Sequence, residues 1–456
     1  MTATRDLVTQ LLERFGDKLL TADHPDYDAV RTGFYGGVDR RPAAIVRAAT
    51  VVDVATTIAL VRDAGARLAV RGGGHSLAHH SASDGGIVLD LSAMKAVDID
   101  ARHRTAWAEA GLTAAELLAA VSEQGLVVGF GDSGSVGIAG ITLGGGIGYL
   151  SRLHGLTIDN VLAADVVTAD GELLRADVDS NPDLYWAIRG GGGNFGVVTR
   201  LQYRLHQLPS VLGGILILPA TPAVIAAVMA HAQAAPDELS LIVNVMVAPP
   251  MPFLPPEVHG KLIVMAIVCY AGDSAAGERA IAPLRAIAPP LVDMVHPSTY
   301  PELFPPEPEA MHPVAATCTM FLDHVDEDAA AVIIDQLTAS DAAMAAVNLR
   351  ALGGAIGRVA TDETAFAHRD RRILANVAAL TFGPDGASAH QAWASELADA
   401  LRDGDNAAYV NFVGEADAAR VHDVYPPATW DRLAAIKQRY DPTNFFRGNH
   451  NIVPAL

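Results

Sequence analysis

One histidine and the glycines before it are the residues best suited to chemistry in this 456-residue chain. The segment consists of Arg71, Gly72, Gly73, Gly74, His75 and Ser76. It follows the apolar residues 66–70, which predict a short buried strand, so the glycines lie where that strand ends in a turn. Because glycine has no Cβ, backbone N–H groups in such a turn can closely approach an anionic or planar ligand. Taken alone, the segment also fits a tight loop that carries an ordinary polar histidine.

Two further glycine clusters, at residues 137–148 and 189–196, indicate that one large ligand touches several backbone turns. Residues 191–196 also satisfy the spacing GxGxxG of dinucleotide-binding proteins. That fingerprint needs a strand before it and a helix after it, so that the pyrophosphate lies at a helix N-terminus. Here the pattern predicts a helix over 183–189 and a strand over 197–205, which is the reverse order. A nicotinamide-dinucleotide site is therefore disfavoured.

These clusters, together with Asp159-Asn160, residues 181–189 and the C-terminal residues 440–452, resemble the FAD domain of berberine-bridge-type oxidoreductases. This is a branch of the vanillyl-alcohol-oxidase superfamily, and the chain is most similar to its 6-hydroxy-D-nicotine-oxidase-like members. The resemblance implies an α+β fold, with a two-subdomain, PCMH-type FAD-binding domain and an inserted substrate domain of antiparallel sheet covered by helices. We expect the FAD domain at 1–207, with its core at about 38–207, the substrate domain at 208–405, and a returning segment at 406–456.

The resemblance also implies that FAD is attached covalently, from the imidazole of His75 to the C8α methyl group of the flavin. Because the ordinary pKa of histidine is about 6.5, much of the imidazole is neutral at physiological pH and can act as the nucleophile. Many relatives carry a cysteine that makes a second bond to flavin C6, but this chain has Ser133 at that position. Attachment through His75 alone is therefore expected, and it favours a smaller or more apolar substrate than a sugar. The remaining residues predicted to bind the cofactor are Asp132, Val136, Gly137, Gly140, Ile141, Thr142, Gly144, Gly145, Gly146, Gly148, Asn160, Val198, Asn449 and Asn451.

The predicted catalytic residues, Tyr409 and Asn411, lie in the segment Tyr-Val-Asn-Phe at 409–412. Relatives often have Tyr-x-Asn-Tyr, whose last tyrosine acts as a base beside flavin N5. Here Phe412 replaces that tyrosine, and phenylalanine cannot accept a proton. Either Tyr409 or another side chain serves as the base, or the substrate is an amine or an activated C–H compound that needs no strong base. Tyr409 as a simple core aromatic is an equal alternative.

The resemblance therefore predicts an FAD-dependent oxidase that takes a hydride from a small alcohol, amine or activated C–H compound and passes the electrons to O2. Val136 favours an oxidase, because a small residue at this position accompanies oxygen access in the family. The alternatives are a flavin dehydrogenase or an oxidative cyclase, and a catalytically silent flavin-binding redox protein. No motif in the second half names the substrate.

Composition limits the possible partners. A formal net charge of -20 repels nucleic acid and anionic membranes, so we expect a small-molecule substrate and O2, with a homodimer possible. Cys269 and Cys318 form no metal-binding spacing and no disulfide framework, which fits a reducing cytoplasm. The charged N-terminus argues against a signal peptide, and Pro219 and Pro222 interrupt the most apolar window. We expect a cytoplasmic protein without a metal.

The elements that must position these residues follow from apolar periodicity. The pattern predicts a helix over 51–64, strands over 87–91, 104–109 and 161–169, and a hairpin turn at Asp170-Gly171. Residues 93–99 are expected to be a connection, and 126–148 a glycine-rich loop with no charge except Asp132. Residues 249–256 are expected to be a proline-rich linker. Asp362, Glu363 and Arg369 are expected at a solvated helix start.

Overall fold

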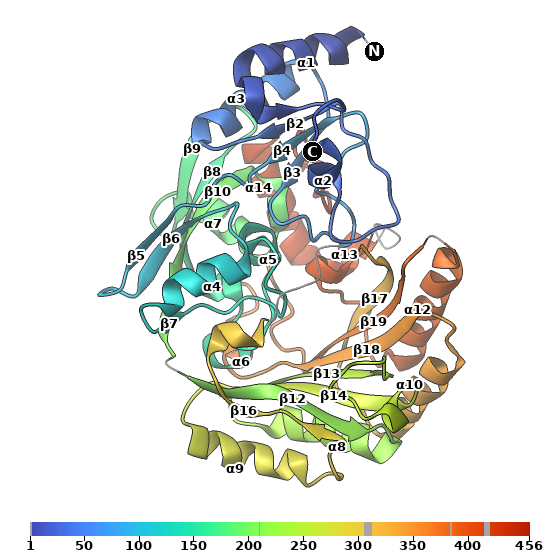
Figure 1. Ribbon diagram of the computed structural model, residues 1–456. Coiled ribbons are helices and arrows are strands. Elements are labelled where there is room, and N and C mark those ends of the chain that lie inside the picture. Colours follow the sequence, from blue (N-terminus) through green and yellow to red (C-terminus); the bar gives the residue numbers. More distant parts are fainter. Residues whose placement is uncertain (1, 209, 305–311, 384, 415–419) are drawn as a thin grey trace.

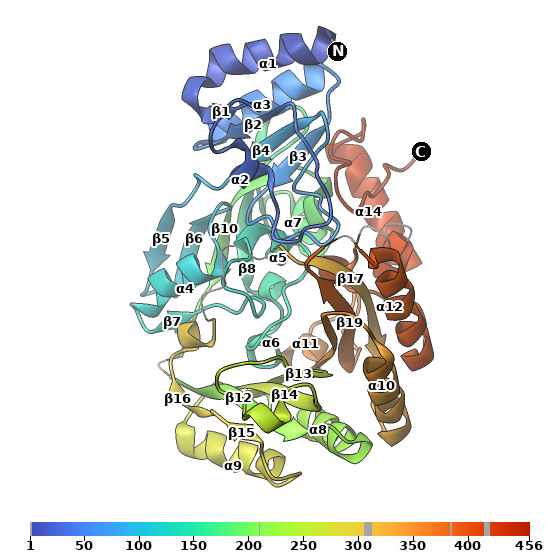
Figure 2. The same ribbon diagram turned by 45° about the vertical axis from the view of Figure 1, so that its right-hand side comes forward.

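The computed structural model describes residues 2–208, 210–304, 312–383, 385–414 and 420–456. Figure 1 shows two sheets and their helices in the first half of the chain, above a larger sheet made by the second half. The last strand of the first half ends at Gln207, and the larger sheet begins at Val211. The chain then returns to the first half through its C-terminal helices, as Figure 2 shows from a second direction.

The first sheet carries the glycine-histidine turn. Its order is β1 (Leu19–Leu20), β2 (Ala44–Arg47), β4 (Ile87–Asp90) and β3 (Leu68–Arg71), with β2 and β3 both parallel to β4. Helices α1 (Thr2–Phe15) and α3 (Val51–Asp63) pack together over it, and α2 (Tyr27–Arg31) lies nearby. Thr50 and Asp53 form a capping box that begins α3 where the sequence predicts it. The turn at 72–76 therefore leaves the C-terminal end of a buried parallel strand.

The second sheet is antiparallel. Its order is β5 (Val97–Asp100), β6 (Thr105–Glu109), β10 (Val197–Arg204), β8 (Val161–Val167) and β9 (Leu173–Asp177). The prediction that 93–99 is only a connection is wrong, because Val97 and Ile99 alternate with two aspartates and form edge strand β5. The hairpin turn at Asp170-Gly171 joins β8 to β9 as expected.

The segment predicted as a long loop, 126–148, contains two regular elements. β7 (Leu126–Val127) pairs with β11 (His206–Gln207), and α5 (Ile138–Leu143) is a short helix between glycine turns. The loop prediction is wrong because glycines obscured the helical spacing of Ile138 and Thr142, which are both buried. The neighbouring helices are α4 (Ala114–Ser122), α6 (Ser151–His154) and α7 (Pro182–Ile188).

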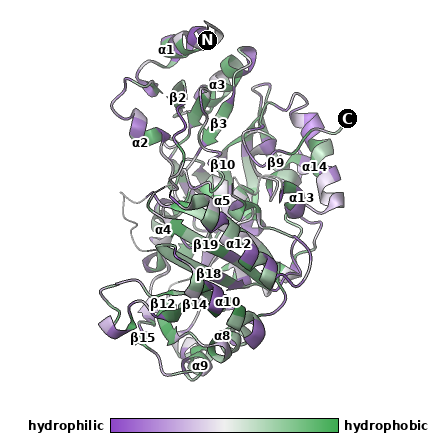
Figure 3. Cartoon of the chain, turned by 90° about the vertical axis from the view of Figure 1, so that its right-hand side faces the viewer, coloured by the Kyte–Doolittle hydropathy of each residue, from purple (hydrophilic) through white to green (hydrophobic). Residues whose placement is uncertain are grey.

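The third sheet is antiparallel and belongs to the second half. Its order is β15 (Val292–Asp293), β12 (Val211–Pro219), β14 (Leu262–Tyr270), β13 (Leu239–Val247), β18 (Met344–Ala351), β19 (Ile373–Thr381) and β17 (Val314–Leu322), with β16 (His296–Ser298) also on β12. One face packs in a single hydrophobic cluster against α8 (Pro222–Ala234), α9 (Ser274–Arg285), α10 (Glu327–Ala339) and α12 (Ala387–Leu401). Figure 3 shows hydrophobic strands beneath helices that carry both hydrophilic and hydrophobic residues. The other face lies toward the first half.

One expectation about the second half is confirmed and another is wrong. The proline-rich residues 249–256 form a linker between β13 and β14, which are neighbours in one sheet. Arg369 is not at a solvated helix start, because its side chain is 1% exposed. It lies beyond the short helix α11 (Ala355–Arg358) and donates from Nη1 and Nη2 to the two carboxylate oxygens of Asp159, at 2.7 and 2.8 Å. This bidentate pair joins the two halves of the chain.

A buried ion pair fixes the C-terminal segment. Helix α13 (Val421–Val424) precedes α14 (Pro427–Tyr440), and Lys437 of α14 is fully buried with Asp441. Lys437 Nζ donates to Asp441 Oδ2 at 2.6 Å, to the Asn194 carbonyl at 2.7 Å and to the Phe446 carbonyl at 2.9 Å. All three ammonium protons are thus used. The pair holds α14, the 189–196 turn and the tail together.

Replacing Lys437 with methionine should lower the free energy of unfolding by about 3–5 kcal/mol, because Asp441 would remain as an uncompensated buried charge. The measurement is chemical denaturation followed by fluorescence. Arg439→Met in the same helix is the matched control. Arg439 pairs with Asp183 at the surface, 64% exposed, and its loss should cost less than about 1 kcal/mol. An equal decrease in the free energy of unfolding in both variants would contradict a central role for Lys437.

None of the helices in the described ranges is long and apolar enough to cross a membrane.

Candidate functional site

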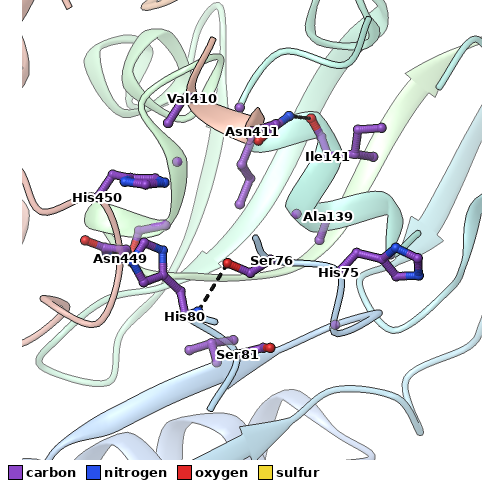
Figure 4. Close-up of a pocket in the computed structure, with 18 of the residues that line it drawn as sticks. His75, Ser76, His80, Ser81, Ala139, Ile141, Val410, Asn411, Asn449 and His450 are labelled. Carbon is purple, nitrogen blue, oxygen red and sulfur yellow. Dashed lines mark hydrogen bonds between the residues drawn. The ribbon is translucent and has the colours of Figure 1, made fainter. Parts of the chain in front are cut away.

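A cavity of about 370 Å³ lies where the three glycine turns meet the C-terminal segment. Figure 4 shows part of its wall, with His75 on one side and His80, Asn449 and His450 on the other. Fifteen of the predicted cofactor-binding and catalytic residues line this cavity. They are Gly72, Gly73, Gly74, His75, Ser76, Asp132, Ser133, Val136, Gly137, Gly140, Ile141, Gly144, Val198, Asn411 and Asn449. The fold thus brings residues far apart in the sequence to one wall.

Glycine is required here for two different reasons. A Cβ on Gly73 would lie 2.3 Å from the backbone nitrogen of Gly137, and a Cβ on Gly137 would lie 2.3 Å from that of Gly73, so the first two turns touch through their backbones. At Gly140 and Gly193 a Cβ would meet no atom within 4 Å, and both residues line the cavity. Side chains at these two positions would occupy space that the turns leave open for a ligand.

The ring of His75 is held in place from two sides. Its Nε2 lies 2.7 Å from Ser135 Oγ, and its ring stacks on Phe34 with centroids 4.3 Å apart and planes at 19°. Ser133 Oγ lies 3.3 Å from Ser135 Oγ, which extends the contact along the wall. Neither cysteine lines the cavity, since Cys269 lies on β14 and Cys318 on β17.

A pair of histidines that was not predicted from the sequence lies at the other side of the cavity. His80 and His450 have ring centroids 4.5 Å apart in an edge-to-face arrangement, and both line the wall. Burial and the neighbouring His450 lower the pKa of His80 to about 3. Burial lowers the pKa of His450 to about 4, against the opposing effect of a hydrogen bond with the Val413 carbonyl. Both rings are therefore neutral at physiological pH. The sequence contains no periodic signal for this pair, because the two histidines are far apart in the chain and only the fold brings them together.

Several buried polar atoms along the site have no hydrogen-bond partner in the described part of the chain. They are Arg71 Nη1, Asn449 Oδ1 and Asn451 Oδ1. The Arg71 guanidinium lies against the turn, since a Cβ on Gly74 would approach its Nη1 to 2.8 Å. An unsatisfied buried polar atom costs roughly 1–3 kcal/mol, so a ligand with hydrogen-bonding groups of its own would stabilise the site. FAD, with its diphosphate, ribityl and isoalloxazine groups, fits the unpartnered Asn449 oxygen and the open glycine positions, which line the cavity.

Tyr409, a candidate base, is buried and is not among the residues that line the cavity. Its hydroxyl accepts hydrogen bonds from the Gly146 N–H and the Asn411 side-chain amide, each at 2.9 Å. Burial raises the pKa of Tyr409, although both hydrogen bonds act in the opposite direction. Asn411 also donates to the Ile141 carbonyl at 3.0 Å (Figure 4). Tyr409 thus orients Asn411, which lines the cavity beside Phe412.

Apart from Tyr409, the other predicted site residues are not among those that line the cavity, namely Arg71, Thr142, Gly145, Gly146, Gly148, Asn160 and Asn451. Three of them have clear structural roles. Thr142 pairs with the Tyr203 hydroxyl at 2.8 Å, and Asn160 donates to the carbonyls of His154 and Leu156. Gly148 is required because a Cβ there would lie 1.9 Å from the Phe130 carbonyl oxygen.

No group of three or more His, Cys, Asp or Glu side chains is arranged to hold a metal ion within the described ranges.

The fold and cavity together define a class of protein in which a flavin nucleotide is enclosed by glycine turns and faced by a separate antiparallel sheet. Residues 42–177 match the family described as FAD binding domain, and residues 408–453 match the family described as Berberine and berberine like. The chain is 30% identical to (R)-6-hydroxynicotine oxidase of Paenarthrobacter nicotinovorans, over 96% of each chain. It is also 30% identical to the uncharacterised FAD-linked oxidoreductase YvdP of Bacillus subtilis, over 94% of this chain and 96% of the other.

Among solved structures, 6-hydroxy-D-nicotine oxidase from Arthrobacter nicotinovorans superposes with a TM-score of 0.85 at 27% identity, covering 96% of this chain and 98% of that one. The chain therefore belongs to the berberine-bridge-like family of FAD-linked oxidoreductases. The resemblance, the α+β fold with a PCMH-type FAD domain, and the assignment as an oxidoreductase are confirmed.

Replacing Gly140 with leucine should lower the flavin content of the purified protein several-fold without lowering its thermal stability. The side chain would fill cavity space, while leucine in helix α5 improves helix propensity by about 0.8 kcal/mol. Flavin absorbance per polypeptide and a melting curve measure the two effects. Gly404→Leu, at an exposed position with open space, is the control and should keep its flavin. Full flavin content in the Gly140 variant would show that the cofactor lies elsewhere.

Proposed function

We propose that this protein is an oxidase that takes a hydride from a small organic substrate, holds its FAD covalently through His75 alone, and uses O2 as the electron acceptor. The observation that carries the proposal is the presentation of His75 on a glycine turn at the cavity wall, with its ring fixed by Ser135 and Phe34. Similarity to an oxidase over nearly the whole chain supports it.

FAD, when bound, supplies the two-electron acceptor for the substrate's hydride. The chain's own residues bind and orient it. The turn at 72–76 and helix α5 provide close backbone approach, and Ser135 and Phe34 hold the imidazole in one orientation for attachment. The wall is largely apolar, and apart from histidines and tyrosines Asp132 is the one ionisable residue among the described residues that line the cavity. Such a wall excludes water from the reacting groups.

Two features support the finer parts of the proposal. Both cysteines lie away from the cavity and Ser133 is on its wall, which supports a single attachment. Val136, a half-buried wall residue of moderate size, supports oxygen access.

In the overall reaction the substrate loses a hydride from carbon and a proton from oxygen or nitrogen. The two electrons and two protons then convert O2 to hydrogen peroxide.

After acid denaturation, the flavin should stay with the polypeptide and map to a peptide that contains His75. In the His75→Ala variant the flavin should be released completely into the supernatant, because no other side chain is proposed to form a bond with it. Absorbance of both fractions and peptide mass mapping measure this. His80→Gln changes another histidine of the wall and should keep the attachment. Flavin released from the native protein would overturn covalent attachment but not FAD binding.

A panel of alcohols, amines and sugars should include a substrate that bleaches the bound flavin anaerobically and yields one hydrogen peroxide per substrate oxidised in air. Oxygen uptake and a peroxidase-coupled assay are the measurements. Bleaching without oxygen uptake would instead favour a dehydrogenase or an oxidative cyclase. A flavin that no member of the panel reduces would favour a silent flavin-binding protein.

A further inference from the structure

The connection between helix α2 and strand β2 contains a closed loop, residues 32–39. Its two ends are held together by Arg31, whose Nη1 donates to Asp39 Oδ1 at 2.5 Å and to the Arg40 carbonyl at 3.2 Å. The side chain of Arg31 is only 11% exposed, and its Nε donates to Asp28 in the same helix. Compact loops whose ends are close together are frequently functional.

The middle of the 32–39 loop contacts the turn that carries His75. The Phe34 N–H donates to the Gly74 carbonyl at 3.0 Å, and the Phe34 ring stacks on the imidazole of His75. The next residue, Tyr35, lines the cavity and meets the Phe34 ring edge-on, with centroids 5.0 Å apart. The loop therefore presents one aromatic ring to His75 and the following one to the cavity.

The tip of the loop lies against the third sheet. The Gly36 N–H donates at 3.0 Å to the carbonyl of Pro313, which directly precedes the edge strand β17. A Cβ on Gly36 would lie 2.4 Å from the His312 carbonyl oxygen, and a Cβ on Gly37 would lie 3.0 Å from Val314 Cγ1. Side chains at the tip would therefore separate the loop from the strand.

The two contacts of the imidazole restrain different motions. The hydrogen bond with Ser135 holds Nε2 but lets the ring turn about that bond, whereas the stacked face of Phe34 fixes the plane of the ring. Orientation matters for a nucleophile, because a misplacement of about 1 Å can lower a rate by roughly 100-fold. Since Phe34 lies between the turn and the edge strand, the orientation of His75 depends on both halves of the chain.

We propose that Phe34 is a positioning residue for the attachment of FAD to His75, and that the 32–39 loop makes this attachment depend on docking of the third sheet. The inference rests on the covalent attachment proposed above. Attachment replaces one C8α–H bond of the flavin and the ring N–H bond of His75 with an N–C8α bond. The two electrons and two protons that are released convert one O2 to hydrogen peroxide.

The test follows attachment over time. Full-length protein from riboflavin-limited cells is incubated with FAD in air, and the flavin fluorescence of the acid-denatured polypeptide gives the covalent fraction. Phe34→Leu should attach FAD on the order of tenfold more slowly, because leucine keeps the apolar bulk but has no flat face. Phe34→Tyr keeps the ring and should keep the native rate. The covalent fraction of protein from riboflavin-replete cells is compared in the same way.

Phe382→Leu is the matched control for this change. Phe382 is 62% exposed and is not among the residues that line the cavity, so its loss should leave the rate unchanged. Phe34→Met replaces the leucine variant if that variant does not fold, which a melting curve shows.

A second measurement separates positioning from cofactor binding. In the His75→Ala variant FAD binds without attachment, and a fluorescence titration gives its dissociation constant. Adding Phe34→Leu to this variant should leave the dissociation constant unchanged, because Phe34 is not among the residues that line the cavity.

Gly36→Ala tests the dependence on the third sheet. Its Cβ would meet the His312 carbonyl oxygen and push the tip of the loop away from β17, so attachment should slow to a similar extent. Gly404→Ala is the control, since a Cβ there meets no atom within 4 Å, and it should keep the native rate.

A native rate in Phe34→Leu would overturn the positioning role, as would a loss of FAD affinity as large as the loss of rate. Slow attachment in Phe34→Leu with a native rate in Gly36→Ala would overturn the dependence on the third sheet. These results leave the proposed function standing. A native protein that retains no flavin after acid denaturation would overturn the proposed attachment and this inference together.

Discussion

The arrangement of the site depends on one buried ammonium group. Lys437 is placed by helix α14, and its three hydrogen bonds end on the 189–196 turn, on Asp441 and on the tail at Phe446. Asp441 in turn accepts from the backbone N–H groups of Phe445 and Phe446, so the pair also shapes the chain that follows it. Asn449 and His450 reach the cavity from that tail. A charge buried this deeply is tolerated only when every proton has an acceptor, so these segments must assemble together.

A second constraint is the polar joint between the two halves of the chain. Arg369 binds Asp159 with both terminal nitrogens, and Arg350 binds Asp132. Trp186 and Arg189, at the end of helix α7, donate to backbone carbonyls at 362 and 363. These directional contacts position the third sheet over the glycine turns more narrowly than apolar packing would. The distance between the third sheet and the cavity is therefore fixed by hydrogen bonds whose donors lie in both halves of the chain.

Most of the frame could be predicted from the sequence, because it follows local rules. Apolar periodicity located α3, β8 and β10, and glycine spacing located the turns that form the cavity. The predictions failed where the local sequence pattern indicated one structure and contacts with distant parts of the chain determine another. Gly140 and Gly144 concealed helix α5, and aspartates concealed edge strand β5, whose outward face is solvated. Arg369 looked like a surface residue because nothing near it in the sequence identifies Asp159, 210 positions away, as its partner. The His80 and His450 pair was missed for the same reason.

The substitution of Phe412 has a consequence beyond the loss of a base. A tyrosine hydroxyl at this position would have to share its surroundings with the Arg350 guanidinium, which lies over the ring. A phenyl ring instead offers its π face to the cation and leaves Arg350 free to bind Asp132 and Asn348. The Tyr409 hydroxyl accepts hydrogen bonds from Gly146 and Asn411, and Tyr409 is not among the residues that line the cavity. In place of a phenol at position 412, the cavity wall therefore carries a carboxylate, that of Asp132, which a buried arginine holds.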